Sequence, residues 1–263
     1  MPESSAHPNA RPQHPLDQSD ASQPTAPQTA DSRRTAVLSI DDRHTLWNVS
    51  REDRAEALAT RPLLLMLHGW GARESDILPL ASSLPPEFVV AAPRAPLDAG
   101  NDYGFAWYPI AALREPAAGG DQTDARPAAD ALVRWLDEVA PVGSRSAQIS
   151  VLGFSQGGLM TTELLRTHAH LLRATVNLSG YVAQQPRELD ELLRVERPPV
   201  FWGRADRDPV IPPHLTQFTE QWLPAHSALD ERVYAGIGHA VSAQELSDVS
   251  AFLDEHVLKE SQG

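Results

Sequence analysis

Short apolar runs alternate along the chain with longer stretches in which apolar residues recur every three or four positions. Runs of the first kind are typical of strands buried on both faces of a sheet, and stretches of the second kind are typical of helices. We expect strands at residues 62–67, 88–92, 146–152, 173–180, 199–203 and 230–234. We expect helices at residues 75–84, 124–139, 156–168, 186–193, 212–222 and 242–257. This order predicts an α/β fold, a doubly wound and mostly parallel sheet with helices on both faces.

The two ends of this pattern differ. Residues 1–34 are rich in Pro, Gln, Ser and Ala and show no apolar periodicity, so we predict a disordered tail. Residues 35–263 are predicted to form a single domain. Its start, residues 35–40 and 45–49, is predicted to be a hairpin at a sheet edge.

Composition narrows the class of protein. The chain has 263 residues, 41% of them hydrophobic, with a net charge of −13 and a pI near 5.1. This acidity disfavours nucleic acid and anionic membrane surfaces as partners. No run of 18 apolar residues predicts a membrane span, and residues 1–5 resemble no secretory signal, so we expect a cytoplasmic protein. Lys259 is the only lysine in the sequence, and all other basic side chains of the Lys/Arg type are arginine. This bias is typical of proteins from GC-rich bacterial genomes.

Cofactor chemistry finds no support in the sequence. Cysteine is absent, which removes disulfides, thiolate metal sites and a cysteine nucleophile. The chain also lacks the GxGxxG, P-loop and HExxH patterns. We therefore expect neither a cofactor nor a metal.

The candidate chemistry begins at residues 153–157, GFSQG, between an expected strand and an expected helix. A G-x-S-x-G sequence in that context is typical of the nucleophile elbow, a sharp turn that presents a serine, here Ser155. Side chains at Gly153 and Gly157 would collide with the neighbouring strand and helix. The alternative is a glycine-rich turn with an ordinary serine.

A serine nucleophile needs a base, and the base needs a carboxylate that orients it. In this type of fold the chain order is Ser, Asp or Glu, then His. His239, in the sequence GIGH after the last expected strand, is the candidate base. Asp208, in DPVIP after the preceding strand, is the favoured carboxylate, with Asp206 as the competitor. The competing histidines at positions 214, 226 and 256 are less suitably placed.

Residues 68–71, HGWG, follow the first buried strand. A loop in this place supplies one backbone N–H of the oxyanion hole in hydrolases, and the residue after the nucleophile supplies the other. The candidate donors are the N–H groups of Trp70 and Gln156. An ordinary strand-to-helix turn is the alternative interpretation. The long irregular stretch 97–120 contains Phe105, Trp107 and Tyr108, which we expect to form a substrate-binding wall over the site.

These residues resemble the α/β-hydrolase superfamily, and within it the phospholipase/carboxylesterase group that includes acyl-protein thioesterases. The resemblance covers residues 62–257 and rests on LHGWG at 67–71, PRAP at 93–96, GFSQGG at 153–158, DPVIP at 208–212 and GH at 238–239. It implies Ser155, Asp208 and His239 as a catalytic triad, Trp70 and Gln156 as oxyanion donors, no cofactor and an open apolar groove.

The chain departs from this group at two loops. Ala72 stands where the group usually has Asp, and Arg204-Ala205 stands where it usually has His-Gly. These changes bear on loop packing and substrate preference more than on catalysis.

The sequence therefore predicts a serine carboxylesterase that cleaves small-molecule esters of short to medium acyl chains through an acyl-enzyme intermediate. A thioesterase or lysophospholipase using the same triad is the alternative, as is a non-catalytic binding module on the hydrolase fold. The oligomeric state is left open, with a homodimer as one alternative.

Overall fold

A computed structural model describes residues 37–100, 102–110, 124–141, 143 and 149–259. The chain divides into two units, Met1–Ala36 and Val37–Gly263. The predicted tail at 1–34 lies outside the described residues, and all elements below belong to the second unit.

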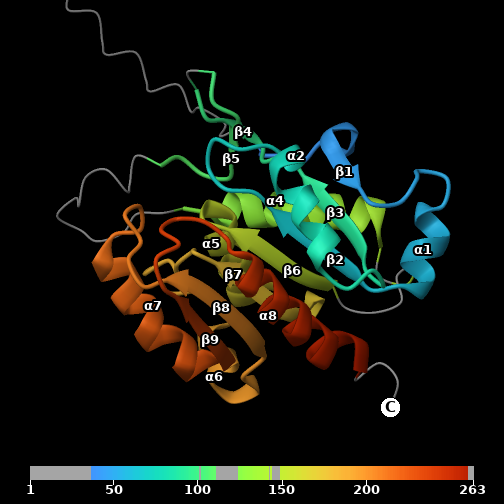
Figure 1. Cartoon of the computed structure of the whole chain (residues 1–263). Helices are drawn as coiled ribbons and strands as arrows, with labels where there is room; N and C mark the ends of the chain where they lie inside the picture. Colours follow the sequence, from blue (N-terminus) through green and yellow to red (C-terminus); the bar gives the residue numbers. More distant parts are fainter. Residues whose placement is uncertain (1–36, 101, 111–123, 142, 144–148, 260–263) are drawn as a thin grey trace, which may run out of the picture. The chain divides into compact units, whose positions relative to one another are not determined.

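A seven-stranded sheet in the order β1-β3-β2-β6-β7-β8-β9 forms the centre of this unit (Figure 1). All neighbouring strands pair in parallel except β1 and β3, which are antiparallel. The strands are β1 (Thr45–Trp47), β2 (Leu63–Leu67), β3 (Val89–Pro93), β6 (Ile149–Phe154), β7 (Leu172–Leu178), β8 (Pro199–Ala205) and β9 (Ala228–Tyr234). A separate two-stranded ribbon pairs β4 (Leu97–Asp98) with β5 (Phe105–Ala106). The mostly parallel α/β sheet confirms the predicted fold class.

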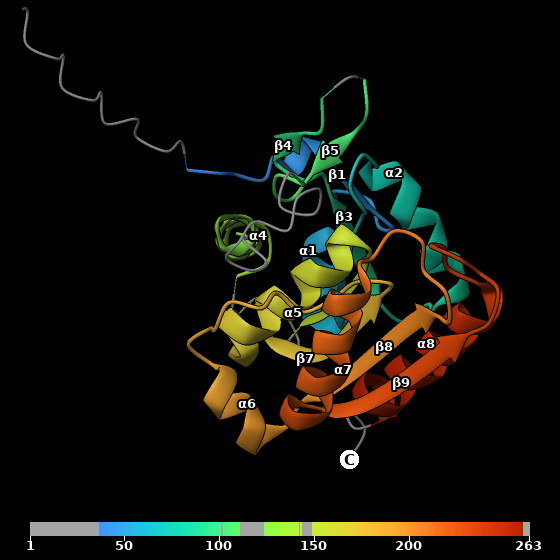
Figure 2. The ribbon, with the colours of Figure 1, turned by 90° about the vertical axis from the view of Figure 1, so that its left-hand side faces the viewer.

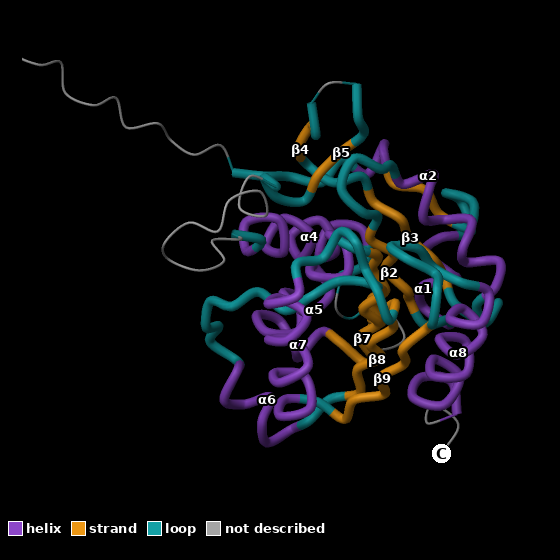
Figure 3. Tube along the Cα trace, turned by 60° about the vertical axis from the view of Figure 1, so that its left-hand side comes forward, coloured by secondary structure: helices purple, strands orange, loops and turns teal. Residues whose placement is uncertain are grey.

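Helices cover both faces of the sheet, as Figures 2 and 3 show. They are α1 (Arg54–Thr60), α2 (Glu74–Ile77), α4 (Arg126–Val139), α5 (Gln156–His168), α6 (Asp190–Glu196), α7 (Pro213–His226) and α8 (Ala243–Leu253). Short 3-10 turns lie at Asp42–His44, Leu78–Ser83 and Ala169–Leu171, and a π-helical turn at Asp254–Lys259 follows α8.

Strand β2 shows why its sequence is continuously apolar. Leu63, Leu65 and Leu67 pack into the core that also contains residues of α4, α5, α6 and α7. Leu64 and Met66 point to the opposite core, which contains residues of α8 and of the 3-10 turn at Leu78–Ser83. Successive side chains of a strand point to opposite faces, so a strand between two helical layers needs apolar residues at every position.

The predicted hairpin at the start of the domain is wrong. Residues 42–44 form a 3-10 turn, and β1 pairs with β3 rather than with the residues before it. Asp41 caps the turn by accepting a hydrogen bond from the Arg43 N–H, 3.0 Å away. Local alternation identified an extended edge segment but did not identify its partner strand, because pairing depends on a distant part of the chain.

Two helices differ from the predicted pattern. The predicted helix at 75–84 splits into α2, which begins at Glu74, and a 3-10 turn. Helix α1 has no predicted counterpart, because Leu58 is the one fully buried residue in it and apolar periodicity is therefore weak there. At the other end of the chain, Ser242 and Glu245 form a capping box at the start of α8.

Candidate active site

The nucleophile turn lies between β6 and α5. Ser155 has φ 57° and ψ −114°, a strained conformation for a residue with a side chain. A Cβ on Gly153 would lie 2.1 Å from the carbonyl oxygen of Gly157. A Cβ on Gly157 would lie 2.1 Å from the carbonyl oxygen of Leu67 on β2. The turn is therefore tight on both sides of the serine, which explains both glycines of the motif.

Three side chains from different loops converge at this turn. His239 Nε2 lies 2.8 Å from Ser155 Oγ, and His239 Nδ1 lies 2.7 Å from Asp208 Oδ2. A carboxylate can only accept, so His239 Nδ1 carries the proton that it donates to Asp208, and Nε2 is free to accept the serine hydroxyl proton. The imidazole and the carboxylate are mostly buried, with 14% and 11% of their side chains exposed.

Backbone groups fix the carboxylate of Asp208. Its Oδ1 accepts hydrogen bonds from the N–H groups of Val210, at 2.8 Å, and Ile211, at 3.1 Å. The ring of Phe154 packs against His239, with centroids 5.0 Å apart. The structure therefore brings together, within hydrogen-bond distance, the three side chains predicted from the sequence as a triad.

Asp206, the competing carboxylate, lies elsewhere. Its Oδ1 accepts a hydrogen bond from the N–H of Gly236 at 3.0 Å, and its own N–H donates to the carbonyl of Tyr234 at 3.1 Å. Asp206 thus holds the loop that carries His239. The sequence contained no signal for this pairing because the two residues lie 30 positions apart.

The two candidate oxyanion donors lie beside the nucleophile. The backbone N–H groups of Trp70 and Gln156 make no hydrogen bond to any residue that the structure describes. Gln156 is the first residue of α5, where N–H groups lack partners within the helix and the helix dipole is positive. An anionic oxygen beside Ser155 would find donors there.

A cavity of about 260 Å³ opens onto the nucleophile, and its walls are largely apolar. It is lined by Gly69, Trp70, Ala72, Tyr108, Ile110, Phe154, Ser155, Gln156, Tyr181, Val210, Ile211 and His239. The sequence did not indicate Tyr181, Val210 or Ile211 as residues of the cavity wall. Their positions could have done so, because each lies just after the carboxyl end of a central strand.

The three aromatic residues predicted to form a substrate-binding wall lie in three different environments. Tyr108 lines the cavity. Phe105 lies outside it, and the guanidinium groups of Arg73 and Arg94 are 5.2 Å and 4.5 Å from its ring centre. Trp107 is completely buried and also lies outside the cavity lining.

The residues that the structure describes contain no group of three or more His, Asp or Glu side chains that could hold a metal ion. None of their helices is long and apolar enough to cross a membrane.

Comparisons with known proteins fit this geometry. The family model described as Phospholipase/Carboxylesterase matches residues 54–257. The chain is 26% identical to acyl-protein thioesterase 1 of Kluyveromyces lactis, covering 76% of this chain and 94% of that protein. It is 25% identical to a rice protein (Oryza sativa subsp. japonica) named "Probable carboxylesterase", covering 79% of this chain and 82% of that protein.

Solved structures show the same architecture. The crystal structure of esterase PE8 covers 84% of this chain and 99% of its own, with 25% identity and a TM-score of 0.61. The carboxylesterase of Bacillus cereus covers 81% of this chain and 93% of its own, with 22% identity and a TM-score of 0.64.

Proposed function

The chain belongs to the phospholipase/carboxylesterase family, and we propose that it hydrolyses carboxylic esters of short to medium acyl chains through an acyl-enzyme intermediate. The observation that carries this proposal is the continuous hydrogen-bonded series Ser155–His239–Asp208, of which Ser155 and His239 line an apolar cavity.

The reaction follows from the roles of these groups. His239 Nε2 accepts the Ser155 proton as Oγ attacks the ester carbonyl carbon, and the carbonyl oxygen becomes an oxyanion. The N–H groups of Trp70 and Gln156 stabilise that oxyanion. His239 then returns its proton to the departing alcohol, and the acyl group stays on Ser155.

Water completes the cycle. His239 removes a proton from a water molecule that attacks the acyl carbon and forms the second tetrahedral intermediate. As the bond between Ser155 Oγ and the acyl carbon breaks, His239 returns the proton to Oγ and the carboxylic acid leaves. Asp208 stays ionised throughout and stabilises the imidazolium form of His239. Each donor of an oxyanion hole contributes roughly 3–4 kcal/mol to the transition state.

The cavity suits the acyl part of such a substrate. An apolar cavity of about 150 Å³ is large enough for benzene, so the 260 Å³ here has room for an acyl chain of several carbons. Tyr108 and Tyr181 belong to its wall and are our candidate substrate-contacting aromatics. A thioester would use the same series of steps with a thiol as the leaving group, and the thioesterase relative supports this as the second candidate activity.

Hydrolysis of p-nitrophenyl esters from acetate to palmitate tests the proposal. We expect turnover that is greatest at short or medium chains in the wild type. The Ser155→Ala variant should lose at least about 10³-fold in kcat, because no other group can form the acyl-enzyme. A wild type that is inactive on every ester and thioester would reject the esterase proposal in favour of a binding module. A Ser155→Ala variant as active as an active wild type would reject the acyl-enzyme mechanism on Ser155.

The cytoplasmic location and the bacterial origin stay predictions from sequence alone. Cell fractionation tests the location, and sedimentation of the purified chain tests the homodimer alternative.

A further inference from the structure

Trp107 connects the two segments that carry the oxyanion donors. Its backbone N–H donates a hydrogen bond to Gln156 Oε1 at 2.8 Å. Its indole N–H donates to the carbonyl oxygen of His68, also at 2.8 Å. The side chain is fully buried, so water does not compete for either bond.

These two partners are adjacent to the reaction. Gln156 carries one candidate donor N–H itself, and His68 lies two residues before Trp70, which carries the other. One donor belongs to the start of α5 and the other to the loop after β2, so their separation depends on contacts between two elements. We propose that Trp107 is a positioning residue that sets the geometry of the oxyanion hole, an inference that rests on the proposed esterase function.

His68 completes the connection on the loop side. The N–H of Ala95 donates to His68 Nε2 at 3.1 Å, so the ring proton lies on Nδ1, which donates to the carbonyl of Gly69 at 2.8 Å. Burial lowers the pKa of His68 and keeps this neutral form. Two consecutive carbonyls, those of His68 and Gly69, are thus held, and the following N–H of Trp70 is left without a partner among the described residues.

Gln156 completes the connection on the helix side. Its Oε1 accepts from the Trp107 N–H, and its Nε2 donates to the carbonyl of Tyr108 at 2.7 Å. Only 5% of Gln156 is exposed. The buried carboxamide is therefore clamped at both ends, and residues 107–108 are fixed to the first turn of α5.

The Trp107→Phe variant tests this role, because it keeps an aromatic ring and the backbone N–H while it removes the indole donor together with part of the buried ring volume. We expect kcat for p-nitrophenyl butyrate to fall about ten-fold, less than the roughly hundred-fold or greater loss for removal of a whole donor. KM should change less than about two-fold, because the oxyanion exists only in the transition state.

Two further readouts separate positioning from general structural damage. The affinity for a boronic acid, which forms a tetrahedral adduct with the serine, should fall by the same factor as kcat/KM. The pH profile of kcat/KM should keep its shape, because His239 and Asp208 are untouched.

Trp135→Phe is the matched control. Trp135 is 2% exposed and packs in the same core as Trp107, but its indole N–H has no hydrogen-bond partner among the described residues. We expect this variant to have a lower thermal midpoint and an unchanged kcat.

Gln156→Met supplies a second test that does not alter Trp107. Methionine approximates the shape of glutamine and removes the acceptor for the Trp107 N–H, while the backbone N–H of position 156 stays. We expect kcat to fall again about ten-fold at constant KM.

The proposal is overturned if both variants fold and keep kcat within about two-fold of the wild type, or if only KM changes. If Trp107→Phe does not fold, Gln156→Met decides by the same criteria. A wild type without any esterase or thioesterase activity instead rejects the proposed function, and this outcome is seen before any variant is made.

Discussion

Glu245 is a single residue whose burial has a measurable cost. Its side chain is completely buried in the first turn of α8. One oxygen, Oε2, lies 3.4 Å from the Ser242 N–H, and Oε1 has no hydrogen-bond partner among the described residues. Gly203 on β8 leaves room for it, since a Cβ there would lie 2.2 Å from Oε1. Loss of hydration on burial raises the pKa of Glu245 from 4.5 to about 7.

This raised pKa predicts a pH-dependent stability. Between pH 4.5 and about 7 the folded chain keeps a proton on Glu245 that the unfolded chain has lost, so the free energy of unfolding falls as the pH rises through this window. In Glu245→Gln this contribution disappears. We measure the free energy of unfolding in urea for both proteins at pH 4.5 and pH 8. The value for the variant minus the value for the wild type should be up to about 3 kcal/mol larger at pH 8 than at pH 4.5.

Glu138→Gln removes one negative charge from an exposed position on α4 and is the control. Its free energy of unfolding should stay within about 0.5 kcal/mol of the wild type at both pH values. A Glu245→Gln difference that is the same at pH 4.5 and pH 8 would contradict the buried-carboxyl explanation.

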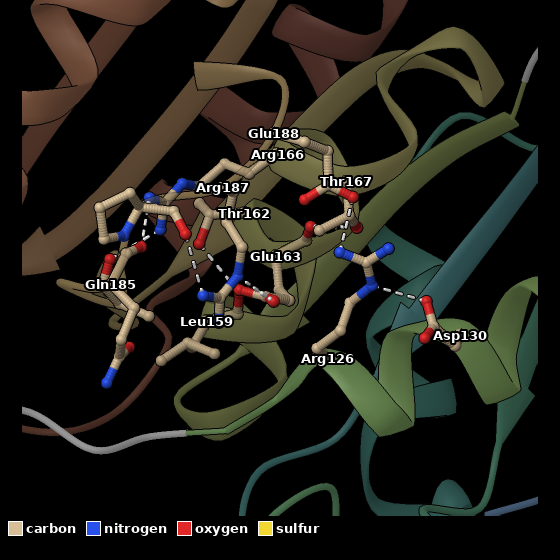
Figure 4. Close-up of polar contacts among 12 residues, drawn as sticks. Arg126, Asp130, Leu159, Thr162, Glu163, Arg166, Thr167, Gln185, Arg187 and Glu188 are labelled. Carbon is tan, nitrogen blue, oxygen red and sulfur yellow. Dashed lines mark hydrogen bonds and ion pairs between the residues drawn. The ribbon is translucent and has the colours of Figure 1, made fainter. Parts of the chain in front are cut away.

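At the scale of elements, α5 is anchored by buried charges (Figure 4). Arg166 makes two hydrogen bonds to Asp190, the first residue of α6, at 2.7 Å and 2.8 Å. It also donates to the carbonyls of Ala183 and Gln185, and its guanidinium lies 4.9 Å from the ring centre of Trp222 on α7. A second buried pair joins Glu163 Oε1 to Arg187 Nε at 2.6 Å. The nucleophile helix is thus fixed to α6, α7 and the segment between β7 and α6.

Removal of Arg166 should be costly for this reason. Arg166→Met leaves the carboxylate of Asp190 and two carbonyls without their charged donor in a buried place, and Arg166 itself is 1% exposed. We expect the free energy of unfolding to fall by about 3–5 kcal/mol in urea titrations at pH 7.

Arg194→Met removes an arginine from an exposed ion pair, with 3.6 Å between Arg194 Nε and Glu191 Oε1. Its cost should stay below about 1 kcal/mol. If the two substitutions cost the same, the buried network is not a stabilising anchor.

Sequence patterns identified elements best where the environment is uniform. The runs at β2 and β3 were recognised because both faces of each strand are covered by apolar layers. Helix α5 has no solvent-exposed face, because every residue from Gln156 to Thr167 is buried. In the sequence, Glu163 and Arg166 look like ordinary surface charges although both are buried. Charge pairing between α5 and α6 depends on tertiary contacts, which periodicity does not report.

For the whole molecule, the described core begins at Ile40 and the family match begins at residue 54. The sequence assigns residues 1–34 to a tail outside the domain. We expect a chain that starts at residue 35 to have the same kcat as the full-length protein and a thermal midpoint within about 2 °C of it.

A longer truncation, starting at residue 50, is the comparison. It removes β1, and with it Trp47, whose ring lies 6.0 Å from that of Trp135 and 4.1 Å from the guanidinium of Arg54. This loss should lower the thermal midpoint by about 5 °C or more. A similar decrease for the chain that starts at residue 35 would show that the predicted boundary is wrong.

Residue patterns along the chain predicted the α/β class, the turn at Ser155 and the candidate order Ser155, Asp208, His239, because buried strands and tight turns restrict residue types locally. The folded structure brings distant groups together. It paired β1 with β3, joined Asp206 to the loop of His239, and moved Trp107 from the expected substrate wall to a buried link between Gln156 and His68. Every residue carries backbone groups that can form hydrogen bonds. The sequence therefore does not reveal which backbone group a given side chain will contact, and only the folded structure shows this.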